Sequence, residues 1–196
     1  MMKTLRIAGL AAVVASVAAC SSAPVHFHTL VPPASAGPAS VSPFVIDVMP
    51  VGVPPQVDQP SLVLRSGATA VSVQDGERWA SPLSDEVRSA LAADLSSRLG
   101  THDVHGLPRA KDARVVAIQV DVRRFDSELG GNATLEAAWS VRAEGVSANC
   151  ASRLSQPAGG SVDSLVDAHQ RAVGELADQI GVVARAIASG QPGTCR

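Results

Sequence analysis

The sequence predicts an α+β fold: a mixed, largely antiparallel sheet with two amphipathic helices packed on one face. Two runs in which apolar and polar residues alternate, 116–123 and 135–142, predict strands with one apolar face. Two longer stretches, 83–99 and 162–187, repeat apolar residues every three or four positions and predict helices with an apolar stripe. Because each predicted element has one apolar side, the helices are expected to cover the apolar face of the sheet.

The first 19 residues have the pattern of a secretory signal peptide. Lys3 and Arg6 form a short positive region, and an uncharged run rich in alanine and valine follows at 7–19. This run fits the apolar core of a signal peptide, roughly 7–15 residues. It is shorter than the roughly 20 residues that a helix needs to cross a bilayer. The chain is therefore expected to be exported, with residues 1–19 removed.

The segment Val17-Ala18-Ala19-Cys20 resembles a bacterial lipobox, in which the cysteine sulfur receives a diacylglycerol and the chain is cut just before it. The alternative is a secreted protein in which Cys20 has no special role. Two or more acyl chains give stable membrane anchoring, because each buried methylene contributes about 0.8 kcal/mol. Ser21 and Ser22 follow, and the absence of an aspartate there implies, for a Gram-negative lipoprotein, sorting to the outer membrane with the protein facing the periplasm.

Residues 20–43 are predicted to be the lipidated N-terminus and a tether rich in proline, alanine and serine. Residues 44–196 are predicted to form a single α+β domain. The β-branched run 44–53 predicts a strand, and the run 61–75 predicts two short strands around Ser66-Gly67.

The first helix is predicted to begin after Ser81, which is a favourable N-cap, with Pro82 at the first helical position. The acids Asp85 and Glu86 stand in its first turn, where they interact favourably with the helix dipole. Gly100 stands where a left-handed C-terminal residue is expected.

The two alternating runs that follow predict a hairpin, and a further strand is predicted through 150–154. The last helix is predicted to begin near Ser161 or Ser164 and to end near Gly190. His169 lies on its apolar stripe, where a histidine of the core or its border is the usual explanation.

The expected export of the chain bears on the state of its three cysteines. If Cys20 carries lipid, Cys150 and Cys195 remain as an even pair in an oxidising environment, where a disulfide between them can persist. The alternative is two separate thiols, with Cys195 frayed close to the end of the chain.

Composition and motifs argue against several classes of function. The whole chain has a net charge of −2 and no cluster of basic residues that would indicate nucleic acid or an anionic lipid surface as a partner. No G-x-S-x-G, P-loop, G-x-G-x-x-G or paired zinc-ligand pattern is present, and the five histidines have no such companions. The chain is therefore not expected to be an enzyme, nor to bind a metal or another cofactor.

Five stretches, taken in order, resemble the PqiC/YmbA family, the auxiliary lipoproteins of mammalian-cell-entry (MCE) type lipid-transport systems. They are FHTL at 27–30, VMPVGVPPQVDQPSLVLR at 48–65, RWASPLSDEVRSALAADLSSRL at 78–99, LEAAWSV at 135–141 and LADQI at 176–180. Three positions depart from the family pattern. Gln59 replaces an arginine and Ser81 replaces a glutamate, so a contact that either charge makes in relatives is not expected here. His28 replaces the usual tyrosine.

The resemblance implies a non-enzymatic outer-membrane lipoprotein that docks an MCE-type tunnel protein, with an ABC permease and ATPase elsewhere in the system and a ring-like homo-oligomer at the membrane. Arg78 and Trp79 are the predicted interface residues, since arginine and tryptophan are common interface anchors. The alternative is that Trp79 packs on the sheet and Arg78 is solvated. The alternative function is an envelope-assembly or cell-wall-associated lipoprotein that binds peptidoglycan or a periplasmic protein.

Overall fold

The computed structural model describes residues 24–33, 41–108 and 110–195, and it confirms the predicted α+β class. The two helices are α2 (Leu83–Leu99) and α3 (Val162–Ala188). The strands are β1 (His26–His28), β2 (Val45–Val48), β3 (Ser61–Arg65), β4 (Val71–Trp79), β5 (Val115–Ser127), β6 (Asn132–Ala143) and β7 (Val146–Pro157). These strands divide between two sheets, whereas the sequence predicted one.

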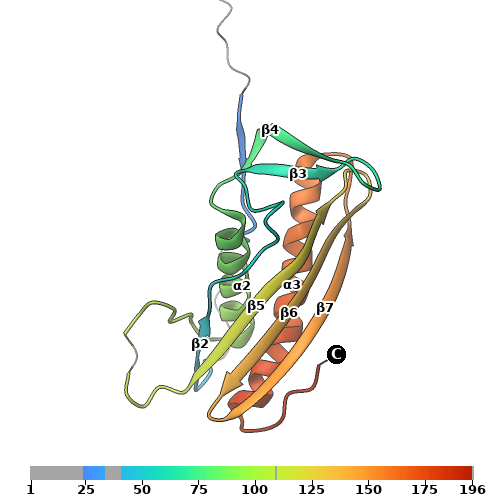
Figure 1. Ribbon diagram of the computed structural model, residues 1–196. Helices are drawn as coiled ribbons and strands as arrows, with labels where there is room; N and C mark the ends of the chain where they lie inside the picture. The colour runs from blue at the N-terminus through green and yellow to red at the C-terminus, as the bar shows by residue number, and fades with distance from the viewer. Residues whose placement is uncertain (1–23, 34–40, 109, 196) are drawn as a thin grey trace, which may run out of the picture.

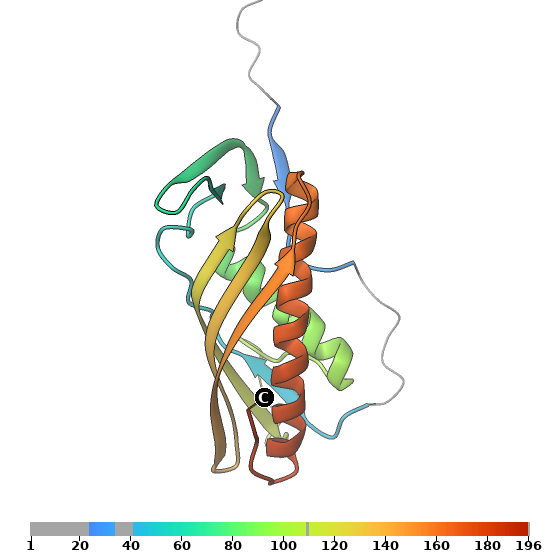
Figure 2. The ribbon, with the colours of Figure 1, turned by 90° about the vertical axis from the view of Figure 1, so that its right-hand side faces the viewer.

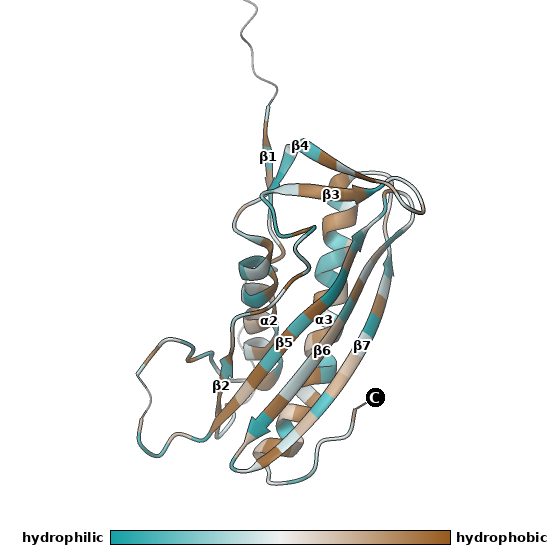
Figure 3. Ribbon diagram, in the orientation of Figure 1, coloured by the Kyte–Doolittle hydropathy of each residue, from teal (hydrophilic) through white to brown (hydrophobic). Residues whose placement is uncertain are grey.

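The larger sheet has the strand order β2-β5-β6-β7. Strands β5, β6 and β7 form an antiparallel meander, and β2 pairs with β5 in parallel. Polar and apolar residues alternate along these strands, as the predicted hairpin requires (Figure 3). Both helices lie on the same face of the sheet, with α3 along β6 and β7 and α2 beside α3 (Figures 1 and 2).

The smaller sheet has the order β1-β4-β3 and lies across one end of the larger sheet (Figure 1). Strand β1 pairs in parallel with the end of β4, and β3 pairs with β4 antiparallel. Leu62 and Leu64 of β3 are buried and face the core. An irregularity in the pairing beside Ser61 bends the ribbon, so β4 can contact β3 and then β1.

Ordered structure begins before the predicted domain boundary at residue 44. The range 20–43, predicted as a tether, contains β1 and also Leu30, which is fully buried in the core. Three residues are too few to display the alternation by which a strand is predicted. The signal peptide 1–19, Cys20 and residues 34–40 lie outside the described residues.

The helix ends partly match the predicted ones. The N-cap of α2 is Pro82, in an extended conformation with φ −48° and ψ 140°, and not Ser81 as predicted. The reason is that the Ser81 hydroxyl donates its hydrogen bond to the Glu86 carboxylate and does not cap the helix backbone. Gly100 is left-handed with φ 66°, as expected. Helix α3 begins after Ser161, whose side chain accepts a hydrogen bond from the backbone N–H of Ser164.

The chain after α3 turns back onto the edge strand β7. Cys150 of β7 and Cys195 are joined by a disulfide, with their Cα atoms 5.6 Å apart. Gly193 lies so close to α3 and β7 that an added Cβ would be 2.6 Å from Val183 Cγ1 and 3.2 Å from Ala148 Cβ. The bond closes a loop with a sequence separation of 45, and the chain-entropy model assigns such a loop roughly 4 kcal/mol of stabilisation.

His169 of α3 lies in the core between the helices and the larger sheet. Its ring stacks on Phe125 with centroids 3.9 Å apart, and its Nε2 is 2.8 Å from the hydroxyl of Ser127. Its Nδ1 has no hydrogen-bond partner among the described residues. Burial lowers the pKa of His169 to about 3, against the opposing effect of the Asp126 charge. The histidine is therefore neutral in the folded protein at neutral pH.

This burial predicts a pH dependence of stability. The unfolded chain binds a proton at His169 near its ordinary pKa of 6.5, and the folded protein does so only near 3. The free energy of unfolding should therefore fall as the pH falls from 6.5 towards 3, by about 1.4 kcal/mol per pH unit from this residue. Denaturant unfolding at several pH values should show a smaller slope for His169→Gln than for the native protein. The exposed control His102→Gln should keep the native slope, and an unchanged slope in His169→Gln would contradict the assignment.

Candidate functional site

The Glu86 carboxylate joins the N-terminal segment to the start of α2. Glu86 is only 3% exposed, and it accepts four hydrogen bonds. Two come from the segment after β1, namely Thr29 Oγ1 at 2.7 Å and the Leu30 N–H at 2.8 Å. Two come from Ser81, its N–H at 3.0 Å and its hydroxyl at 2.7 Å. These bonds fix the chain leaving β1 against the first turn of α2, where the helix dipole also favours a carboxylate.

Trp79 is 5% exposed and packs inside the protein. Its ring meets Phe125 edge to face, with centroids 6.1 Å apart, and Phe125 in turn stacks on His169. This row of three rings links β4, β5 and α3. Trp79 is therefore not the exposed interface residue that the sequence predicted, because it is needed to join the two sheets. Arg78 is exposed and lies beside Phe27 in the register of β1 and β4.

An open cavity of about 430 Å³ has Trp79 among its lining residues. It is lined by two segments distant in the sequence: Asp58, Gln59, Pro60, Trp79, Ala80, Ser81 and Pro82. The backbone N–H of Trp79 donates to the carbonyl of Pro60 at 2.9 Å, which holds the two segments together. The lining is mainly apolar, and Asp58 is its one charged residue. This cavity, here called the Trp79 pocket, has the volume and lining to receive an apolar side chain.

A second cavity, of about 450 Å³, lies at the other end of α2. It is lined by residues 41–45, 100–102 and 112–114. None of the segments that carry the family resemblance contributes to it. The Trp79 pocket, by contrast, is built entirely from two of those segments.

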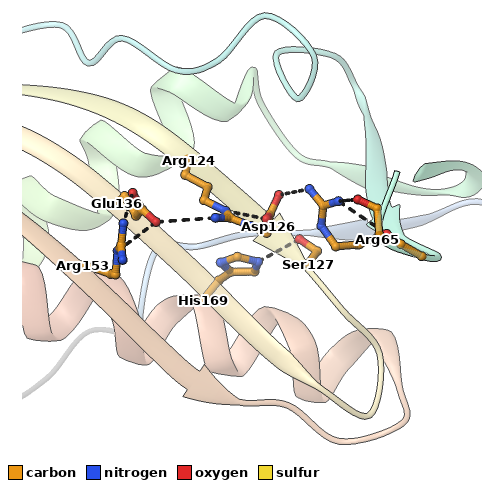
Figure 4. A network of polar contacts seen from close by, with 9 residues as sticks. Arg65, Arg124, Asp126, Ser127, Glu136, Arg153 and His169 are labelled. Carbon is orange, nitrogen blue, oxygen red and sulfur yellow. Dashed lines mark hydrogen bonds and ion pairs between the residues drawn. The ribbon is translucent and has the colours of Figure 1, made fainter. Parts of the chain in front are cut away.

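A row of charged side chains crosses the outer face of the larger sheet and reaches the β3–β4 hairpin (Figure 4). Asp126 lies between Arg65 Nη2 at 2.8 Å and Arg124 Nε at 2.6 Å. Arg124 continues to Glu136 at 3.7 Å, and Arg153 Nε reaches Glu136 at 3.0 Å. Burial acts to raise the pKa of Asp126, but the hydrogen bonds from Arg65 and Arg124 outweigh it and hold that pKa below its usual value.

Two histidines of β1 contact one carboxylate of β4. His26 Nδ1 is 3.1 Å and His28 Nε2 is 2.5 Å from the two oxygens of Glu77. The hydrogen bonds with His28 and then His26 lower the pKa of Glu77. The contacts fasten β1 to β4. Within residues 24–33, 41–108 and 110–195, no group of three or more histidine, cysteine or acidic side chains is placed to hold a metal ion.

The membrane attachment predicted at Cys20 lies outside the described residues. Neither α2 nor α3, the helices of the described chain, combines the length and the hydrophobicity that crossing a bilayer requires.

The sequence and the fold are similar to those of known proteins. Residues 28–181 match the model of the family described as the ABC-type transport auxiliary lipoprotein component. The crystal structure of an uncharacterized protein has a TM-score of 0.65 and 19% identity, over 81% of this chain and 97% of that chain. A crystal structure from Xanthomonas campestris, assigned to the family model DUF330, has a TM-score of 0.58 and 19% identity, over 85% and 96% of the two chains. At this identity the two structures show the fold alone. No curated protein matches the chain.

The four hydrogen bonds to Glu86 predict a large effect of a small substitution. Glu86→Gln replaces one acceptor oxygen by an NH₂ group that faces N–H and O–H donors, so it should lower the free energy of unfolding by about 2 kcal/mol or more. Asp85→Asn is the matched control, because Asp85 is adjacent and exposed, and it should cost no more than about 0.5 kcal/mol. Denaturant unfolding measures both. Equal stability of the two variants would show that the carboxylate does not hold the N-terminal segment.

Proposed function

Because this chain belongs to the family of ABC-type transport auxiliary lipoproteins, we propose that it is the docking lipoprotein of an intermembrane lipid transporter. In this proposal a lipid on Cys20 anchors the protein in the outer membrane, and the domain faces the periplasm. The domain binds the end of an MCE-type tunnel protein, while an ABC permease and ATPase act elsewhere in the system. The subunit has a binding role and no catalytic one, and several copies surround the tunnel as a ring.

The observation that carries the proposal is the composition of the Trp79 pocket. The segments 48–65 and 78–99 resemble family segments, and the family match spans both of them. In the fold the end of the first and the start of the second line one cavity. Two segments that carry the resemblance thus meet at this surface, which supports a role of that surface in what the family has in common.

The chemistry of the pocket suits a protein partner. Trp79, Pro60, Ala80 and Pro82 contribute the apolar part of the lining, and Pro60, Ala80 and Pro82 are exposed to solvent. Arg78, which precedes Trp79 in β4, is exposed and can pair with an acidic group of a partner. Binding pockets of this kind typically receive an apolar anchor residue and surround it with polar contacts. We expect the tunnel protein to supply such an apolar side chain.

The pocket can be tested without disturbing the core. Trp79→Ala is unsuitable, because truncating a buried tryptophan costs about 3–5 kcal/mol. Ala80→Arg instead places a charged side chain over the pocket from an exposed position whose backbone N–H still donates to the His28 carbonyl. Ala110→Arg is the matched control, an exposed alanine in the loop between α2 and β5.

Both variants would be expressed with a tag, cross-linked in intact cells and purified, and their partners would be identified by mass spectrometry. The native protein and Ala110→Arg should recover an MCE-type protein and multimers of the lipoprotein. Ala80→Arg should lose roughly tenfold or more of the MCE-type protein, which corresponds to about 1.4 kcal/mol of binding free energy. Recovery of peptidoglycan fragments or wall enzymes with the native protein, and of no MCE-type protein, would instead support an envelope-assembly or cell-wall role.

A further inference from the structure

We propose that one end of the domain is a membrane-contact surface that rests on the bilayer carrying the Cys20 lipid. This surface, here called the tethered end, is formed by the start of β1, the β3–β4 hairpin and the β5–β6 turn (Figure 1). Its apolar residues are Val25, Phe27, Val71, Val73 and Leu129. The inference rests on the lipid anchor of the proposed function and adds to it a second, non-covalent contact with the membrane.

The tethered end exposes several large apolar side chains to solvent, which is unfavourable. Phe27 is 66% exposed, Val71 58% and Val73 48%. The turn of the β3–β4 hairpin and the start of β4 also lack charge, since residues 66–74 read SGATAVSVQ, and residues 66–70 are all exposed. An exposed strand at a sheet edge usually carries charged residues that prevent association. An exposed, apolar segment without charge indicates a surface that a membrane or another protein covers in the working molecule.

The hairpin is held in place by polar contacts of Arg65 and by the buried residues of β3. The Arg65 guanidinium donates to the carbonyls of Gly67 and Ala68 at 3.5 and 3.4 Å, and it also pairs with Asp126 of β5. Leu62 and Leu64 of β3 are buried in the core. The small sheet is thus fixed by its inner face and by Arg65, and this leaves Val71 and Val73 presented outward.

The length of the chain before β1 identifies the bilayer as the occupant. Cys20 precedes Val25 by five residues, and a chain of five residues spans at most about 18 Å even when fully extended. A lipid on Cys20 therefore brings the tethered end to within that distance of the membrane surface. Helix α3 begins at this end and runs away from it for 27 residues, or about 40 Å (Figures 1 and 2). The opposite end of the domain lies beyond the reach of the same tether.

The charges at the tethered end indicate an apolar contact and not an electrostatic one. Asp75 and Glu128 are exposed there, and Arg78 is an exposed cation beside Phe27. Arg65 is paired with Asp126. Binding to anionic lipid surfaces depends on clusters of basic residues, and this end has none among its described residues. The contact should therefore depend neither on anionic lipid nor on low salt.

The test places a fluorescent reporter on the surface of the full lipidated protein. Phe27→Cys and Val73→Cys each introduce a thiol that can be labelled with an environment-sensitive dye, because Cys20 carries the lipid and Cys150 and Cys195 share a disulfide. Val182→Cys is the matched control, a 50% exposed valine on α3. Each labelled protein is reconstituted in vesicles of phosphatidylethanolamine, with and without phosphatidylglycerol, and in vesicles with nitroxide-labelled lipid.

The proposal predicts a blue-shifted dye emission at residues 27 and 73 in vesicles, and loss of that emission with nitroxide-labelled lipid, at low and high salt alike. The dye at residue 182 should remain water-like and unquenched. Vesicle-bound protein with water-like emission at 27 and 73 would overturn the proposal and leave the anchor intact. A blue shift that is equal in detergent and insensitive to nitroxide lipid would assign the surface to a second copy and also overturn it. Failure of the protein to float with the vesicles would overturn the lipid anchor itself, and the inference with it.

Discussion

The interaction on which the arrangement of the molecule depends is the buried carboxylate of Glu86. Its hydrogen-bond donors come from two parts of the chain. Ser81 is close to it in the sequence, whereas Thr29 and Leu30 lie more than 50 residues before it. A buried carboxylate is costly unless its hydrogen bonds are made, so the segment after β1 must take the position that supplies them. The place where a membrane tether leaves the domain is thereby fixed relative to α2 and to the Trp79 pocket.

A second constraint joins the two sheets. The aromatic row from Trp79 through Phe125 to His169 packs the small sheet on the large one, and the pair of Arg65 with Asp126 links β3 to β5. The pocket and the tethered end therefore belong to one packed unit. In the proposed role, an anchored protein built in this way would hold the Trp79 pocket at a fixed height and orientation above the membrane.

Elements with a long, regular pattern could be predicted from the sequence. The hairpin of β5 and β6 and the long helix α3 display their periods over many residues, and Gly100 marks the end of α2 by its left-handed conformation. Strand β1 and the role of Glu86 could not, because three residues show no period and the partners of a carboxylate are set by tertiary contacts. The division into two sheets escaped prediction for the same reason. Trp79 before a helix is equally compatible with an exposed and a buried ring, and only packing against Phe125 decides between them.

The most direct measurement of the central claim, docking at the Trp79 pocket, is site-specific photo-cross-linking in intact cells. A photoreactive amino acid at Gln59, which lines the pocket and is partly exposed, would report what lies within a few ångströms of it. The account predicts one principal adduct, with the end of an MCE-type tunnel protein. An adduct with a wall enzyme, or no adduct in cells that contain the transporter, would contradict it.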